Sequence, residues 1–202
     1  MLPSTSSEAK FKLTAQSFKN MDLPIVVLSI VLVQGLAHVS QLILARLLSP
    51  ADFGVVRNVE AALQVIVILG SCGMPSLSAK CLAEVEDESL RAVLIGRLAL
   101  LALSASLIAA CAGLVLLPPF VPGIAQAYLR YAIWAVLFTC AGKTLLHYFQ
   151  GVKKLGSLST LTACFALTSL TLLVGLTLLV GLSGWLIAKY ASECVLLLLC
   201  LW

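Results

Sequence analysis

Apolar residues fill most of the chain in long stretches, separated by short polar or proline-rich breaks. The first uncharged stretch, between Asp22 and Arg46, is longer than the apolar part of a signal peptide, which has about 7–15 residues. A membrane-spanning helix needs about 20 apolar residues. The pattern therefore predicts an all-α, polytopic membrane bundle with six transmembrane helices. We expect these helices over residues 23–48, 52–79, 92–117, 124–150, 155–180 and 184–202.

The breaks carry local signals of their own. Ser49 precedes Pro50, and Asp52 follows three residues after Ser49. This is a capping-box pattern with proline at the first helical position, so we expect a helical hairpin to turn here. Glycines and a proline within residues 70–75 interrupt the second helix and leave its end undefined. Residues 80–91 are predicted to form a strongly charged loop.

The composition excludes several classes of protein. The chain has 202 residues, of which 61% are hydrophobic and 11% are charged. Its mean hydropathy is +1.08, whereas a soluble domain is about 45–50% apolar and about 25% charged. This excludes a soluble enzyme, a secreted disulfide scaffold and a disordered protein. The seven cysteines form no CxxC motif, and we interpret them as small packing residues.

Basic residues predict the orientation in the membrane, because short cytoplasmic loops carry an excess of Lys and Arg. The side that holds residues 1–22 collects most of them, so we expect these residues to form a cytoplasmic N-terminal segment. The net charge of +4 and the lack of a Lys/Arg run argue against a nucleic-acid partner. The cytoplasmic set is Lys10, Lys12, Lys19, Lys80, Arg91, Arg97, Lys153 and Lys154, against Arg46, Arg57 and Arg130 at most on the other side.

Polar residues recur within the apolar stretches at helical spacing. Such residues are costly in lipid and usually face the bundle interior or a water-filled cavity. Spacings of i, i+3 or i+4 and i+7 place them on one face of each helix. The 92–117 and 155–180 helices have almost none, which favours a scaffold role for them. The stripes are Gln34, His38 and Gln41; Arg57, Glu60 and Gln64; Lys143, His147 and Gln150; and Lys189 with Glu193.

Simpler interpretations stay open for several of these residues. The Arg57–Glu60 and Lys189–Glu193 pairs can neutralise each other, and the stripe in the first helix can form interhelical hydrogen bonds. Lys143 has no acidic neighbour on its own helix, which makes it the strongest candidate for a substrate contact. Several cations together would suit an anionic ligand such as a lipid-linked phosphate. The candidate binding cations are Arg46, Arg57, Lys143 and Lys189.

Motifs for covalent or metal chemistry are missing from the sequence. His38 and His147 lack a ligand partner one helical turn away, and the chain has no GxGxxG motif and no P-loop. We therefore expect no catalytic residue, no metal and no cofactor, and a function other than that of an enzyme.

Residues 45–56 read ARLLSPADFGVV. This segment resembles the first hairpin of the polysaccharide (O-antigen type) flippases in the multidrug/oligosaccharidyl-lipid/polysaccharide exporter superfamily, where A-R-x-L-x-P-x-x-F-G is typical. Residues 148–156, YFQGVKKLG, are similar to the turn between the fourth and fifth helices of those proteins. Residues 70–80 resemble the glycine-rich end of their second helix. The order and spacing of the three segments extend the resemblance over nearly the whole chain.

The resemblance implies a transporter in polysaccharide or lipopolysaccharide biosynthesis. Such proteins flip lipid-linked oligosaccharides across the bacterial inner membrane by alternating access between two six-helix lobes. This sequence supplies the N-terminal lobe only, so the resemblance also implies a second lobe, as a separate chain, a missing C-terminal half or a second copy. The last helix ends at Trp202 without a basic anchor, and we favour a truncated or divided chain.

Two other functions stay open. A drug- or ion-coupled exporter of the same superfamily would need a carboxylate at membrane depth, which Glu60 or Glu193 could supply. A non-transporting membrane scaffold, or a truncated fragment, would instead use the small-residue faces of the 92–117 and 155–180 helices as its binding surface.

Overall fold

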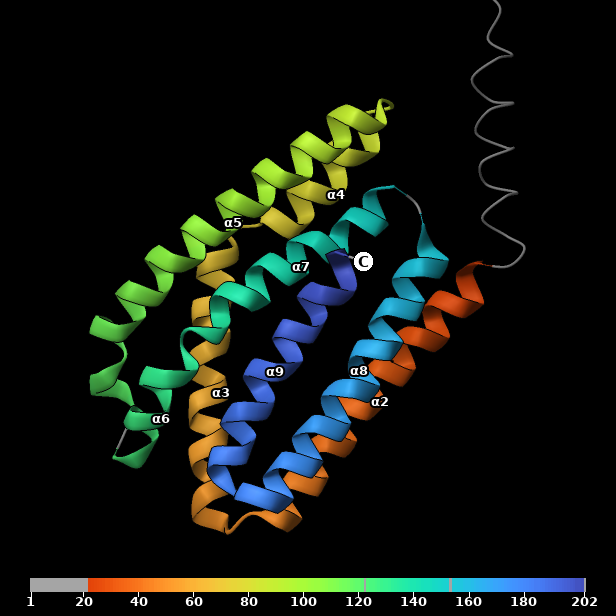
Figure 1. Cartoon of the computed structure of the whole chain (residues 1–202). Helices are drawn as coiled ribbons and strands as arrows, with labels where there is room; N and C mark the ends of the chain where they lie inside the picture. The colour runs from red at the N-terminus through yellow and green to blue at the C-terminus, as the bar shows by residue number, and fades with distance from the viewer. Residues whose placement is uncertain (1–21, 122, 153, 202) are drawn as a thin grey trace, which may run out of the picture.

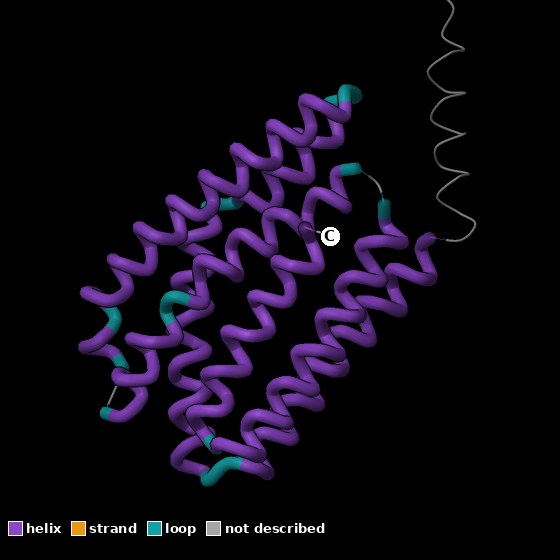
Figure 2. The backbone as a smooth tube through the Cα atoms, viewed as in Figure 1, coloured by secondary structure: helices purple, strands orange, loops and turns teal. Residues whose placement is uncertain are grey.

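The computed structural model describes residues 22–121, 123–152 and 154–201, so the expected N-terminal segment lies outside the described residues except for Asp22. The described residues form helices joined by short turns, without strands (Figure 2). Five helices are long and apolar enough to cross a membrane, and a bent helix pair makes a sixth span when it is taken as one. The predicted all-α membrane bundle is confirmed.

The first two helices form the predicted hairpin. Helix α2 covers Asp22–Leu47, and α3 covers Pro50–Ser71. The side-chain oxygen of Ser49 accepts a hydrogen bond from the backbone N–H of Asp52 at 3.1 Å. Pro50 occupies the first helical position, where its missing N–H is not needed. The capping signal is therefore confirmed.

The second predicted helix is interrupted within residues 70–75, as predicted, and the interruption is a break between two helices. Cys72 and Gly73 have φ angles of 44° and 73°, and helix α4 then covers Met74–Glu84. Pro75 lies near the start of α4, where proline is well tolerated, so it begins a helix instead of ending one. Because α4 extends to Glu84, the predicted charged loop over residues 80–91 is wrong. The loop contains only residues 85–87.

Helix α5 covers Glu88–Leu116 and begins earlier than the sequence predicted. Asp87 is its N-cap, and its carboxylate accepts a hydrogen bond from the backbone N–H of Ser89 at 2.9 Å. A short 3-10 helix, η1, follows at Pro118–Phe120. The prolines there end α5, because proline cannot continue its hydrogen-bond pattern.

The fourth predicted helix is bent by 46° between α6, Ile124–Ala132, and α7, Ala135–Gly151. At the bend, Trp134 N–H bonds to the Tyr131 carbonyl and Leu137 N–H bonds to the Trp134 carbonyl. These three-residue spacings replace the α-helical ones and redirect the chain. Helix α8, Leu155–Val180, and helix α9, Leu182–Leu201, then complete the bundle.

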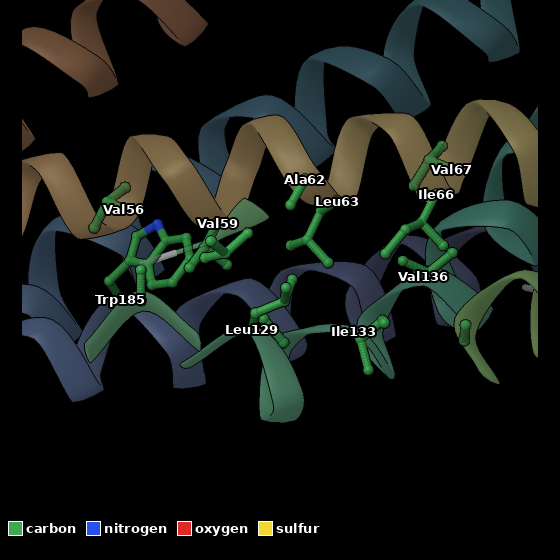
Figure 3. Packing of buried hydrophobic residues seen from close by; sticks show 14 of the residues in the cluster. Val56, Val59, Ala62, Leu63, Ile66, Val67, Leu129, Ile133, Val136 and Trp185 are labelled. Carbon is green, nitrogen blue, oxygen red and sulfur yellow. The ribbon is translucent and has the colours of Figure 1, made fainter. Parts of the chain in front are cut away.

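Helices α3, α6, α7 and α9 form a core group, and α2 and α8 form an outlying pair. Helix α2 packs mainly against α8, and α8 also packs against α9 (Figure 1). The core lies between α3, α6, α7 and α9, where Val59, Ile66, Leu129, Ile133 and Trp185 are buried together (Figure 3). Helices α2 and α3 have few contacts beyond their turn. The α2/α8 pair is therefore held chiefly through α9, which leaves space between the pair and the core group.

Candidate functional site

A cavity of about 310 Å³ lies between the α2/α8 pair and helices α3, α7 and α9. A cavity of this size is at the lower end of the range for small-ligand sites, about 300–1,000 Å³. Most polar side chains on its wall come from turns in the middle of the spanning helices, at membrane depth. They are Ser40, Gln41, Glu60, Gln64, Thr139, Lys143, Ser169, Lys189, Ser192 and Glu193.

An apolar wall closes the end of the cavity nearest the α2–α3 turn. Trp185 is fully buried there beside Val56 and Val59 (Figure 3), and Leu44 lines the same end. The indole N–H of Trp185 has no hydrogen-bond partner within the described part of the chain. A buried donor without a partner is uncommon in a native structure.

Lys189 and Glu193 form an ion pair on the cavity wall. The Lys189 ammonium nitrogen lies 3.1 Å from a carboxylate oxygen of Glu193. The side chain of Glu193 is only 5% exposed, whereas that of Lys189 is 33% exposed. The lysine therefore reaches toward open space while the carboxylate is enclosed by protein.

Glu60 has its cationic partner outside the cavity. Its carboxylate oxygen lies 3.4 Å from a guanidinium nitrogen of Arg57, whose side chain is 50% exposed. Lys143, on α7, forms no ion pair with any described residue. The cavity wall carries two cations, Lys143 and Lys189, and two carboxylates, Glu60 and Glu193, and Lys143 is the cation of this wall that is not held in an ion pair.

The cavity gathers part of the residue set predicted from the sequence. Six of the predicted residues line it, and they come from four helices. The remaining six do not line it, and Gln34, His38 and Arg46 are exposed on the outer surface of α2. The residues inside are Gln41, Glu60, Gln64, Lys143, Lys189 and Glu193, and those outside are Gln34, His38, Arg46, Arg57, His147 and Gln150.

Two of the residues outside the cavity have clear structural reasons for their position. Arg57 forms an ion pair with Glu60 one turn along α3, and its half-exposed side chain lies at the surface. His147 is held by its own helix, because its ring Nδ1 is 2.7 Å from the carbonyl oxygen of Lys143. The predicted cavity-lining role of His147 is therefore not met.

Several wall residues had no signal in the sequence. Helix α8 contributes Phe165, Ser169 and Leu173, although the sequence favoured a scaffold role for it. Ser40 and Thr139 also line the cavity. Single hydroxyl residues are common in spanning helices and bond to their own backbone, as Thr139 does to the Ala135 carbonyl at 3.0 Å. Such residues cannot be distinguished from packing residues by spacing alone.

The arrangement of charges is suited to holding an anion rather than to bond-breaking chemistry. Lys143 and Lys189 line the same cavity, where hydroxyl and amide groups add neutral donors. Hydrogen bonds from charged donors to an anion are about twice as strong as neutral ones.

A family model described as polysaccharide biosynthesis protein matches residues 22–202. Comparisons with curated proteins and with solved structures gave no match. The matched range contains each spanning helix and the whole cavity wall. The chain is therefore a multi-pass membrane protein that belongs to the family of polysaccharide biosynthesis proteins, in the multidrug/oligosaccharidyl-lipid/polysaccharide exporter superfamily that its first hairpin resembles.

Proposed function

We propose that the chain binds a lipid-linked oligosaccharide precursor and takes part in flipping it across the membrane by alternating access. The observation that carries this proposal is the meeting of Lys143 and Lys189 in one cavity at membrane depth, in a chain of the polysaccharide biosynthesis family. The two lysines would bind the anionic phosphate groups that join the sugar to its lipid carrier. No covalent step is needed for this function.

The size of the cavity limits which part of the precursor it holds. A volume of about 310 Å³ is at the lower end of the range for small-ligand sites, so the cavity would hold the diphosphate end of the precursor rather than the whole molecule. The sugar and the lipid chain would then extend beyond the cavity. Gln64 lines the cavity and is also exposed, so the site is open on the side between α2 and α3. This opening would admit a headgroup whose lipid chain stays in the bilayer.

We further propose a location in the bacterial inner membrane with the N-terminus in the cytoplasm. The α4–α5 loop and the α7–α8 turn lie at the same end of the bundle, and the basic residues Lys80, Arg91 and Lys154 are near them (Figure 1). Arg46 and Arg57 flank the turn at the other end. The excess of basic residues at one end supports this orientation. Alternating access would require a second six-helix lobe or a second copy of the chain.

Neutralising Lys143 tests the proposal. In a strain whose surface polysaccharide depends on this protein, Lys143→Gln should reduce the exported polysaccharide at least several-fold, because the cavity loses its cation that is not already paired with a carboxylate. The measurement is the amount of surface polysaccharide, together with the amount of protein inserted in the membrane.

Lys80→Gln is the matched control, since Lys80 is exposed and far from the cavity wall. It should leave export unchanged. Normal export by a Lys143→Gln protein that is inserted at the usual level would show that Lys143 does not bind the precursor.

A further inference from the structure

We infer that a small apolar chamber between α2 and α8 binds the first carbons of the precursor's hydrocarbon chain, next to the diphosphate in the main cavity. The inference rests on the proposed function and deepens it, because it assigns the start of the lipid chain to a subsite of its own. The chamber has a volume of about 160 Å³, and seven of its nine wall residues are apolar. Helices α2 and α8, which form it, lie side by side (Figure 1).

The chamber adjoins the main cavity. Val33 and Leu36 extend its wall toward the N-terminus of α2, whereas Gln41 and Leu44 line only the main cavity. A ligand bound in the main cavity is therefore within reach of the chamber. The two spaces share five wall residues on α2 and α8, which are Ala37, Ser40, Phe165, Ser169 and Leu173.

Polarity falls from the core group to the α2/α8 pair. The charged residues of the main cavity, Glu60, Lys143, Lys189 and Glu193, lie on α3, α7 and α9. Helices α2 and α8 place only neutral residues on the walls of the two spaces. Phosphate oxygens are stabilised beside the lysines, and hydrocarbon is stabilised where no charge has to be desolvated. This order matches a molecule whose anionic group is joined directly to a hydrocarbon chain.

The chamber does not suit the sugar part of the precursor. Its two hydroxyl residues are Ser40 and Ser169, and the Ser40 hydroxyl already donates a hydrogen bond to the Ala37 carbonyl at 2.7 Å. A sugar placed there would lose hydrogen bonds to water without replacing them. Hydrocarbon carries no such cost.

The size of the chamber sets how much of the chain it holds. An apolar cavity of about 150 Å³ stays dry and binds a molecule the size of benzene. By this measure, a chamber of about 160 Å³ holds about five or six carbons. None of its wall residues is fully buried, so the rest of the chain can continue into the bilayer.

Equilibrium binding of two soluble diphosphates tests the chamber. Methyl diphosphate and dimethylallyl diphosphate carry the same charged group, but the second has a five-carbon chain that fits the chamber. Both are titrated into the full chain in lipid nanodiscs, with empty nanodiscs as the blank. Dimethylallyl diphosphate should bind on the order of tenfold to a hundredfold more tightly, because its extra carbons move from water into an apolar site.

Each failure of this experiment points to a different inference. Equal affinities in the wild-type chain would mean that the chamber is empty or holds an ordinary bilayer lipid. That result would overturn the chamber and leave the proposed function intact. A wild-type chain that binds neither diphosphate would instead overturn the proposed function.

Leu170→Trp fills the chamber, since Leu170 lies on its wall. This variant should lose the preference for dimethylallyl diphosphate and keep the wild-type affinity for methyl diphosphate. The matched control is Leu167→Trp, because Leu167 is on the same helix, is 53% exposed and lines neither space. The control should keep the preference. A Leu170→Trp chain with the full wild-type preference would overturn the inference.

Photo-crosslinking of the wild-type chain covers the case in which Leu170→Trp does not fold. The probe is farnesyl diphosphate with a diazirine on the chain segment next to the diphosphate. Mass spectrometry should find the label on chamber residues such as Val33, Leu36 and Leu170, and excess dimethylallyl diphosphate should suppress it. Labels confined to α3, α7 and α9, or labels that dimethylallyl diphosphate does not suppress, would overturn the inference.

Discussion

Asp87 shows how one side chain links the stability of this bundle to pH. Its carboxylate accepts hydrogen bonds from the backbone N–H and the hydroxyl of Ser89, both at 2.9 Å. The backbone bond, followed by the side-chain bond, lowers the pKa of Asp87 below its ordinary value of 3.8. A lowered pKa means that the charged form stabilises the fold above pH 3.8 and that this contribution is lost as pH falls through the folded-state value.

Asp87→Asn should isolate this contribution, because Asn is an equally good N-cap residue but carries no charge. We expect the wild-type chain to unfold at a slightly higher temperature than Asp87→Asn at neutral pH, and the difference to vanish in acid. Thermal unfolding in detergent as a function of pH measures it. Glu86→Gln is the control, since Glu86 is exposed and forms no hydrogen bond or ion pair with described residues. A difference for Asp87→Asn that does not change with pH would contradict the linkage.

The sequence predicted the charged residues of the cavity wall better than the neutral ones. Lys143, Lys189 and Glu193 stood out because a charge at membrane depth needs a specific reason. The Lys189–Glu193 pair, at i and i+4, is confirmed as an ion pair. Trp185 gave no signal, because a tryptophan in an apolar stretch is equally compatible with a lipid-facing position.

At the scale of elements, apolar length predicted where the helices lie but not where they break. Helix α8 covers the predicted range because its sequence has neither a charge nor a proline. The interruption of the second helix within residues 70–75 was predicted, but the new helix α4 that follows it and the bend between α6 and α7 were not. Proline and glycine give the same local signal for a helix start, a kink and an end, and only packing against other helices decides among them.

Gly151 allows a close approach between α7 and α4. A Cβ atom at this position would lie 2.8 Å from the Ala79 carbonyl oxygen and 3.0 Å from the Leu82 Cβ. Gly151→Ala should therefore push the two helices apart and lower the free energy of unfolding by about 1–3 kcal/mol. Thermal unfolding in detergent measures the effect.

The control for this substitution is Gly175→Ala in α8, where nothing lies within 4 Å of the added Cβ. It should leave stability unchanged or raise it slightly, since alanine favours the helix over glycine. If Gly151→Ala were as stable as Gly175→Ala, the close packing of α4 on α7 would not contribute to stability.

The whole molecule determines which polar stripes meet. Spacing along one helix shows which residues share a face, but not where that face points. Gln41 and Lys143 share a cavity because α8 packs on both α2 and α9 and so holds α2 beside the core group. These contacts join segments that are far apart in the chain, and a single sequence carries no direct signal for them.

The opening of the cavity between α2 and α3 should admit water. Gln64 lines the cavity and is exposed at membrane depth, so we expect water to reach it. A cysteine at this position, Gln64→Cys, should react with a water-soluble maleimide in intact membranes, since the thiolate that reacts forms only in a polar environment. Farnesyl diphosphate should slow this reaction by filling the cavity. Native Cys111, exposed on α5 among apolar residues, should stay unlabelled in the same sample, as read by mass spectrometry of the peptides. Equal labelling of both cysteines, or of neither, would mean that the α2–α3 side of the bundle does not open to water.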